Sequence, residues 1–400
     1  MMTRKEFLKR SAAFGIGAPF LGVLLESCEE QASLFPEFDV NFSGNVLVIG
    51  AGAAGLTAGY LLDRYGIDFQ VLEASADFGG RVKRSSDFAD FPIDLGGEWI
   101  HYHPSILARL ISDPNIDANI DIITYGPETI YNWKNDKLKK QNWASNFYSE
   151  YKFKNTTWYG FFERYMVPNI SDRIVYNSPI TEIDYSGTRV IVRNAHGERY
   201  EADKVLITVP VKILQEGNII FTPDLPETKS SAIDSITMPD GIKVFMEFSE
   251  RFYPDILFTG GLISEFSGSD KSYYDAAFRK DSNRNILGLF TVDEKAVPYA
   301  TAATDQQTIE TVITELDTIF DGKASRFYMN HIIQNWSKEP YIQGSYSIHF
   351  DGNFSRIVSD LAAPVSSKLY FAGEATSIDN SSTVHGASES AYSAIEEMLK

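Results

Sequence analysis

A glycine-rich hexapeptide, Gly50-Ala51-Gly52-Ala53-Ala54-Gly55, follows the apolar run Asn45 to Ile49. A continuous apolar run of this length is typical of a strand that is buried on both faces of a parallel sheet. A helix is predicted from about Ala53 to Tyr65, because Gly66 can end it as a C-cap. In this context the glycines permit a tight turn, a close backbone approach to a pyrophosphate, and packing of the helix on the strand.

A second β-rich run, Asp68 to Leu72, completes a βαβ unit, and Glu73 follows it directly. An acidic residue at about 20 residues from the glycines can accept hydrogen bonds from ribose hydroxyls. Strand, turn, helix, strand and acid together predict a dinucleotide-binding fold. They do not distinguish NAD from FAD.

A second glycine pair, Gly79-Gly80-Arg81-Val82, offers more backbone donors and a fixed cation to the same pyrophosphate. With these residues the sequence resembles the flavin amine oxidases, which include monoamine, polyamine and histone-demethylating oxidases. The N-terminal part of the resemblance continues through Asp94-Leu95-Gly96-Gly97-Glu98-Trp99-Ile100-His101. Near the C-terminus it is carried by Leu369-Tyr370-Phe371-Ala372-Gly373-Glu374-Ala375-Thr376 and Thr383-Val384-His385-Gly386-Ala387.

The resemblance implies an FAD site formed by both ends of the chain. Glu374 is expected at the ribityl and pyrophosphate region, the backbone of Thr383 and Val384 at the flavin pyrimidine edge, and the backbone of Ile180 at the adenine. Ser345 stands where monoamine oxidases carry the cysteine that binds flavin covalently, so FAD is expected to be non-covalent. The residues expected at the cofactor are Gly50, Gly52, Ala54, Gly55, Glu73, Gly80, Arg81, Gly97, Glu98, Trp99, Ile180, Trp336, Gly373, Glu374, Thr383 and Val384.

The reaction that the resemblance implies is hydride transfer from the carbon next to an amine nitrogen to flavin N5, with O2 as acceptor and H2O2 as product. Lys243 matches the lysine that reaches N5 through a water in this family; a solvated strand position is the alternative. Tyr346 is expected to face the flavin as an aromatic wall. Thr383 stands where some relatives carry a second wall tyrosine, so the aromatic cage is incomplete. His101 is a candidate substrate contact, or else a structural histidine.

Two alternative functions remain open. One is a flavin-dependent desaturase or dehydrogenase of an apolar substrate, which would share the N-terminal motifs. The other is a flavin-binding lipoprotein without turnover, since the family normally carries a longer helical insertion before the Ile180 region and this chain has only a short aromatic stretch there. No metal site is predicted, because the pair His101 and His103 has no acidic or cysteine cluster nearby.

The elements predict an α/β fold with a Rossmann-like FAD-binding domain of the GR2 type and a second α+β substrate domain that contains a mixed β-sheet. Strands are expected at 205–209, 242–248, 272–278, 286–292 and 368–371, and helices at about 305–320 and 386–399. The FAD-binding domain is assigned to 44–105, 168–225 and 345–400. The substrate domain takes 106–167 and 226–344, although the periodicity within 104–167 is too poor to assign.

The net charge of −18 leaves no basic surface for nucleic acid. Acidic residues could attract a cationic amine to a cleft, or serve solubility alone. The expected partners are therefore a small-molecule amine and O2, with no nucleic acid.

The N-terminus has the composition of an export segment. A charged head, Thr3-Arg4-Lys5-Glu6-Phe7-Leu8-Lys9, precedes an apolar run from Ala12 to Leu25, and residues 1–28 are assigned to this segment. The head resembles a twin-arginine signal, and Leu25-Glu26-Ser27-Cys28 resembles a bacterial lipoprotein cleavage box. The sequence therefore predicts an exported, periplasmic or membrane-anchored protein, lipidated at Cys28 and followed by a linker over 29–43. The alternatives are a plain signal peptide and an uncleaved anchor.

Overall fold

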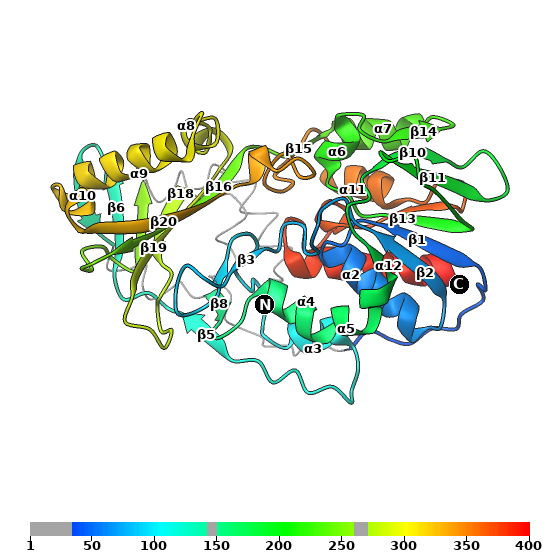
Figure 1. Cartoon of the computed structure of the whole chain (residues 1–400), viewed down its shortest axis with the longest axis horizontal. Coiled ribbons are helices and arrows are strands. Elements are labelled where there is room, and N and C mark those ends of the chain that lie inside the picture. Colours follow the sequence, from blue (N-terminus) through cyan, green and yellow to red (C-terminus); the bar gives the residue numbers. More distant parts are fainter. Residues whose placement is uncertain (1–33, 142–149, 260–270) are drawn as a thin grey trace.

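A five-stranded parallel sheet lies at the centre of one lobe of the molecule (Figure 1). The computed structural model describes residues 34–141, 150–259 and 271–400. The strand order is β22 (Leu369–Phe371), β13 (Lys204–Ile207), β1 (Asn45–Ile49), β2 (Asp68–Leu72) and β9 (Ile174–Val175). The predicted strands 45–49 and 68–72 are confirmed with the same bounds. The chain's two ends therefore meet in one sheet.

The alternating side chains of β1 serve two different cores. Val46 and Val48 face α2 (Ala53–Arg64) and α12 (Val384–Leu399), which pack together beneath the sheet. Leu47 and Ile49 face a second, four-stranded sheet on the opposite side. Its strand order is β12 (Arg199–Ala202), β11 (Val190–Asn194), β10 (Ile180–Asp184) and β14 (Ile220–Thr222). Both faces of the parallel sheet are thus covered, as the apolar strands β1 and β22 require.

The second lobe is a seven-stranded mixed sheet covered by α9 (Asp305–Phe320), which lies at the left of Figure 1. Its order is β20 (Tyr328–Asn335), β16 (Gly241–Phe248), β19 (Asn285–Val292), β18 (Lys271–Asp275), β17 (Ile256–Thr259), β6 (Ile130–Lys134) and β7 (Lys137–Lys140). All neighbours are antiparallel except β17 and β6. The prediction of a Rossmann-like domain with a second, mixed-sheet domain is confirmed.

The predicted strand 272–278 is too long. It ends at Asp275, because the Asp275 carboxylate accepts the Ala277 N–H at 3.1 Å and the Phe278 N–H turns back to the Asp275 carbonyl. Such local side-chain bonds compete with a strand ladder. The predicted helix 305–320 has the bounds of α9, where Thr304 is the N-cap and accepts the Gln307 N–H.

The stretch 104–167 contains two helices and four strands among its described residues. α3 (Ile106–Ile111) and α4 (Trp158–Tyr165) share a core with α2 and α12. β5 (Ile122–Tyr125) pairs with β8 (Glu150–Phe153), while β6 and β7 join the seven-stranded sheet. This stretch therefore contributes to both lobes.

The remaining elements are short. They are β3 (Arg84–Ser85), β4 (Ile93–Asp94), α5 (Val167–Ile170), α6 (Val211–Gln215), α7 (Glu227–Asp234), β15 (Ile236–Thr237), α8 (Val297–Ala300), α10 (Lys323–Phe327), β21 (His349–Phe350) and α11 (Phe354–Ala362). β15 and β21 pair between the lobes, so the chain crosses there side by side (Figure 1).

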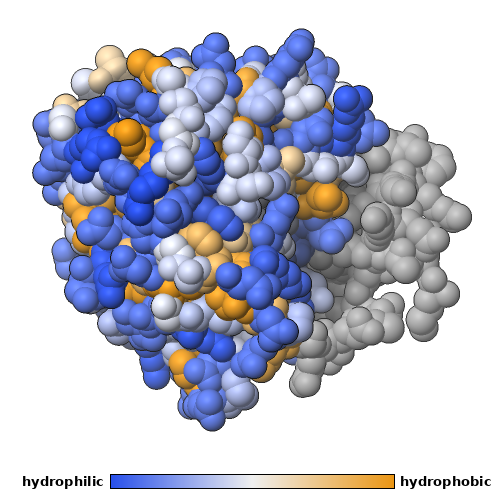
Figure 2. Space-filling view, turned by 90° about the vertical axis from the view of Figure 1, so that its right-hand side faces the viewer, coloured by the Kyte–Doolittle hydropathy of each residue, from blue (hydrophilic) through white to orange (hydrophobic). Residues whose placement is uncertain are grey.

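The first described residues pack on the C-terminal helix. Phe35 stacks on Tyr392 with ring centroids 3.8 Å apart, and the N–H groups of Asn41 and Phe42 donate to the Leu399 carbonyl at 2.9 and 3.2 Å. Within the described ranges, no helix is both long and apolar enough to cross a bilayer. The predicted export segment and Cys28 lie outside the described residues. Figure 2 shows a mainly hydrophilic face, with apolar residues in small separate groups.

Candidate active site at the meeting of the two chain ends

The glycine-rich turn places the N-terminus of α2 at the carboxyl end of β1. Gly50 has φ +103°, a conformation open to glycine, and a Cβ on Gly55 would lie 1.8 Å from the Gly50 carbonyl oxygen. Gly52, the N-cap of α2, has no side chain, and the first turn of α2 carries no acidic residue. The positive end of α2 is thus left to an external anion, as a pyrophosphate site requires.

Glu73 lies at the carboxyl end of β2, and its two carboxylate oxygens are fixed by the backbone. The Ala51 N–H donates to Oε2 at 2.6 Å, and the Ser75 N–H donates to Oε1 at 2.8 Å. Each carboxylate oxygen can accept a further bond, so the group remains able to receive ribose hydroxyls. Burial raises the pKa of Glu73, against these hydrogen bonds, which lower it.

An ion pair joins the two ends of the chain. Arg81 Nη1 lies 2.9 Å from Glu374 Oε1 and also donates to the Ser345 carbonyl at 3.1 Å. Glu374 is 6% exposed and accepts the N–H groups of Ser347 and Ser382 at 3.2 and 3.1 Å. The glycine–arginine segment and the closing segment therefore meet at one place, as the sequence predicts.

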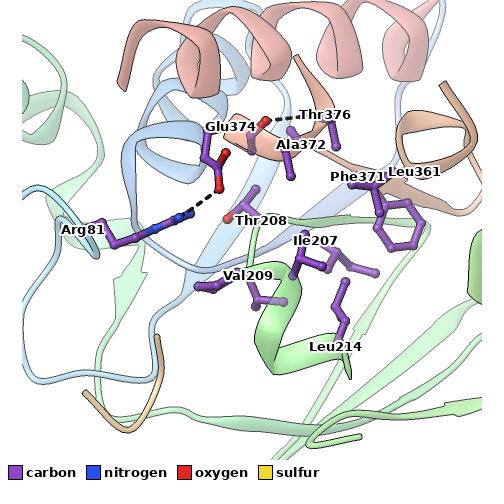
Figure 3. A pocket seen from close by; sticks show the side chains of 14 residues that line it. Arg81, Ile207, Thr208, Val209, Leu214, Leu361, Phe371, Ala372, Glu374 and Thr376 are labelled. Carbon is purple, nitrogen blue, oxygen red and sulfur yellow. Dashed lines mark hydrogen bonds and ion pairs between the residues drawn. The ribbon is translucent and has the colours of Figure 1, made fainter. Parts of the chain in front are cut away.

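A cavity opens beside this ion pair, with an empty volume of about 350 Å³ that includes its mouth. It lies at the carboxyl ends of β13 and β22, and Figure 3 shows Arg81 and Glu374 on one side of it and Phe371 and Leu214 on the other. Gly373 borders it with φ +152°, and a Cβ there would meet no atom within 4 Å. The carboxyl ends of parallel strands are where open α/β sheets bind ligands. The glycine turn, Glu73, Arg81 and the open space at Gly373 fit an elongated dinucleotide.

The loop 94–99 is packed tightly against these segments. A Cβ on Gly96 would lie 1.8 Å from the Arg81 carbonyl oxygen, and one on Gly97 would lie 2.5 Å from Val384 Cγ2. Trp336 is buried and donates its indole N–H to the Leu95 carbonyl at 3.1 Å. Gly97, Trp336 and Val384 are therefore brought together around the loop that follows Arg81.

Lys243 projects from β16 to the same loop. It is 3% exposed, so a solvated strand position is wrong. Its Nζ donates to the carbonyl oxygens of Asp94 and Gly96, each at 3.0 Å, and to Glu98 Oε2 at 2.5 Å. An ammonium has three N–H donors, and these three acceptors use all of them.

Glu98 is the buried centre of a polar cluster. Lys152 Nζ lies 2.6 Å from Oε1, and the Tyr274 hydroxyl donates to Oε2 at 2.5 Å. Burial opposes ionisation of Glu98, but Lys152 and Lys243 outweigh it and lower its pKa to about 2. Burial and the Glu98 charge raise the pKa of Asp94 to about 8. The Glu98 side chain is thus engaged by protein groups, and the Trp99 ring packs at 5.1 Å on Tyr125 beside it.

The histidines take separate positions. His101 Nδ1 lies 3.4 Å from Glu150 Oε1, and its side chain is 37% exposed. His103 Nδ1 lies 3.0 Å from the Ser105 hydroxyl. Among the described residues, no group of three or more His, Cys, Asp or Glu side chains could hold a metal ion.

The remaining predicted residues lie near the ion pair or the parallel sheet. Thr383 caps α12: its hydroxyl accepts the Gly386 N–H at 2.9 Å and donates to the Asn380 carbonyl at 2.7 Å. Tyr346 is half-buried between Ser345 and Ser347, both of which contact the ion pair. Ile180 is buried at the start of β10 and packs in the core of the parallel sheet, with Leu72.

Sequence reasoning missed several polar residues. Lys152 lies between Tyr151 and Phe153, and Tyr274 lies between Tyr273 and Asp275. Neither pattern gives a sign of a buried charge pair. Ser347 and Ser382 follow and precede recognised residues by one position, and only the neighbouring motifs could have pointed to them.

Comparisons with known proteins agree with this geometry. The model of the family described as flavin containing amine oxidoreductase matches residues 160–399, and that of an NAD(P)-binding Rossmann-like domain matches residues 48–112. Polyamine oxidase 4 of Oryza sativa subsp. japonica is 24% identical, over 95% of this chain and 92% of its own length.

Human lysine-specific histone demethylase 2 is also 24% identical over 86% of this chain, which spans about half (52%) of that protein. Two solved structures share the fold. Putrescine oxidase bound to putrescine has a TM-score of 0.72 at 16% identity, covering 88% of this chain and 98% of that one. Cyclohexylamine oxidase from Brevibacterium oxydans has a TM-score of 0.72 at 14% identity, covering 89% and 99%.

Proposed function

We propose how this chain, which belongs to the flavin-containing amine oxidoreductase family, carries out its reaction. The family makes it an FAD-dependent enzyme that oxidises amines. The observation that carries the proposal is the Arg81–Glu374 ion pair of 2.9 Å, because it unites both family segments at one cavity.

Bound FAD would supply the electron acceptor for a hydride removed from the carbon next to an amine nitrogen, with O2 as the proposed final acceptor and H2O2 as the product. The chain's own residues bind and orient. The N-terminus of α2 and Arg81 would hold the pyrophosphate, and Glu73 would receive the ribose hydroxyls. FAD is bound without a covalent link, since Ser345 offers no thiol.

The substrate is a small-molecule amine, in line with the polyamine, putrescine and cyclohexylamine oxidases that this chain resembles. Tyr346, next to the Ser345 carbonyl that accepts from Arg81, is proposed to face the reacting centre. Lys243, which donates to the Gly96 carbonyl, is proposed to place its charge beside it. His101, which is partly exposed beside Glu150, is proposed to contact the substrate at the entrance. The imine product hydrolyses to an aldehyde or ketone.

An anaerobic panel of amines tests this proposal. The purified yellow protein is mixed with putrescine, spermidine, cyclohexylamine, a benzylamine and an N-methylated lysine peptide, and flavin absorbance is recorded. Bleaching by at least one amine, followed by recovery with H2O2 release on admitting air, is expected. FAD binding with no bleaching by any amine would exclude amine oxidation by this panel and favour the non-catalytic flavin protein.

We also propose that the protein is exported and held at a membrane by lipid on Cys28. Only residues 29–33 separate Cys28 from the segment that packs on α12, so the body would remain close to the bilayer. Cys28→Ser should move the protein from the membrane fraction to the soluble fraction. An unchanged distribution, or failure of wild type to incorporate labelled palmitate, would contradict lipidation.

A further inference from the structure

Lys152 places an ammonium in a closed aromatic box. Its Nζ lies 4.8, 5.4 and 5.1 Å from the ring centroids of Trp99, Tyr125 and Tyr274. All three distances are within the range of cation–π attraction. The side chain is 5% exposed, and Glu98 lies at 2.6 Å. Three aromatic faces and one carboxylate thus fix the position of this charge.

Glu98 couples the position of the Lys152 ammonium to that of Lys243, because it contacts both. One carboxylate oxygen faces Lys152, and the other faces Lys243 and the Tyr274 hydroxyl. A carboxylate is planar, so moving one oxygen moves the other. Where Lys243 Nζ lies therefore depends on where Lys152 holds Glu98.

Lys243 in turn holds the loop beside the cofactor cavity. Its other two hydrogen bonds go to the carbonyl oxygens of Asp94 and Gly96. Gly96 touches the Arg81 backbone so closely that a Cβ would lie 1.8 Å from the Arg81 carbonyl oxygen. A displacement of Lys243 would thus reach the segment that carries the Arg81–Glu374 pair.

Stability alone gives a weak reason for this arrangement. Replacing a buried ion pair by apolar residues of similar volume is often neutral or stabilising. Another buried lysine that pairs with a carboxylate is Lys271, whose Nζ lies 2.5 Å from Glu315 and from the Tyr299 hydroxyl. That pair joins β18 to α8 and α9 within the substrate lobe. Of these two lysine clusters, the Lys152 cluster reaches the loop 94–99 and the Lys271 cluster does not, which makes Lys271 a matched control.

We propose that Lys152 and Glu98 are positioning residues, which fix the Lys243 ammonium at the loop beside the cofactor cavity through one shared carboxylate. In this arrangement Lys243 acts as a fixed charge, because its three donors are all taken by the protein. The inference rests on the proposed function, because the proposed function places Lys243 near the flavin.

A double-mutant cycle tests the proposal. The variants are Lys152→Met, Lys243→Met, the double variant, and Lys271→Met as control; methionine keeps the length of the lysine stem. The midpoint potential of bound FAD is the first readout, since removing a fixed cation near a flavin disfavours its reduced anion. Each of the first two changes should lower the equilibrium constant for two-electron reduction at least tenfold, which is about 30 mV.

The midpoint potential of the double variant should be no lower than that of Lys243→Met alone, because Lys152 acts through Lys243. Lys271→Met should leave the potential unchanged. Additive effects of Lys152→Met and Lys243→Met, or no effect of Lys152→Met, would overturn the proposal. If the proteins retain FAD and their midpoint potentials follow the expected double-mutant cycle, but no amine is oxidised, the proposed function is contradicted and this inference stands.

The same variants without FAD, together with wild type and a Lys152→Met/Lys271→Met double variant, provide a second readout. Thermal unfolding of the flavin-free forms should show non-additive losses for the Lys152 and Lys243 changes, and additive losses for Lys152 with Lys271. Additivity in both pairs would overturn the proposal even if wild type binds no flavin.

Discussion

Glu73 holds the turn that receives the cofactor, since one of its oxygens accepts the Ala51 N–H. Glu73→Gln keeps the size of the side chain and removes its charge. Because hydrogen bonds to charged groups contribute about 1.5–3 kcal/mol, we expect FAD affinity to fall at least tenfold. Flavin retained after ultrafiltration measures the change.

Glu310 on the exposed surface of α9 provides the control for that substitution. Glu310→Gln should bind FAD like wild type. Equal affinity of all three proteins would remove Glu73 from the cofactor site.

Single residues of the site were found by motif, but their partners were not. Lys243 stands in a segment that resembles the family, and its burial follows from its strand. Glu98 was recognised as part of a motif and expected at the cofactor, whereas its carboxylate pairs with Lys243 and Lys152. Lys152 comes from a stretch without readable periodicity, and no sequence spacing indicates that it reaches a residue 54 positions earlier.

At the level of helices and strands, patterns with strong periodicity were predicted best. Strands β1 and β2 and helix α9 have the predicted bounds, because an apolar run or an amphipathic repeat with a cap is a local signal. β6 was not predicted. It pairs with β17, more than one hundred residues later. Its mixture of apolar, polar and aromatic residues has no regular period, so the strand is recognisable only from its place in that sheet.

Thr383 has a structural role, because its hydroxyl caps α12. Substitutions at this position can distinguish that role from a contact with substrate. Thr383→Ala should cost about 1 kcal/mol of unfolding free energy, and Thr383→Ser should restore it. Thermal unfolding and kcat/KM are measured on both. If Thr383→Ser alters kcat/KM while restoring stability, the methyl group contacts substrate; if both variants keep wild-type stability, the cap is wrong.

Lys229 in α7 holds the end of α11 through a buried amine. Its Nζ donates to the carbonyl oxygens of Leu361 and Ala363, both at 2.5 Å. Burial lowers its pKa from 10.5 to about 7. The unfolded chain therefore binds more protons than the folded one between these values, so stability rises with pH across this window.

Lys229→Met removes this pH dependence. The difference in melting temperature, wild type minus variant, should increase from pH 7 to pH 9.5. Taking the difference cancels the other titrating groups. A difference that is constant or shrinks over this range would show that Lys229 titrates normally in the folded protein.

On the scale of the molecule, the flavin lobe is assembled from distant parts of the chain. The family motifs indicated this discontinuity, and β1 and β22 indeed share one sheet. The motifs could not show that α3 and α4 pack with α2, because that contact depends on side chains from the aromatic stretch. Nor could they show that residues 35–42 pack against α12.

Binding of FAD by three variants tests most directly that both chain ends hold one cofactor. The dissociation constant is measured for wild type, Arg81→Met and Glu374→Gln, with Arg193→Met as a control that breaks a surface ion pair with Glu182. We predict one releasable FAD per wild-type chain, at least tenfold weaker binding in each of the two site variants, and no change in the control. A wild-type protein that takes up no FAD, or site variants that bind it as tightly as wild type, would contradict the account.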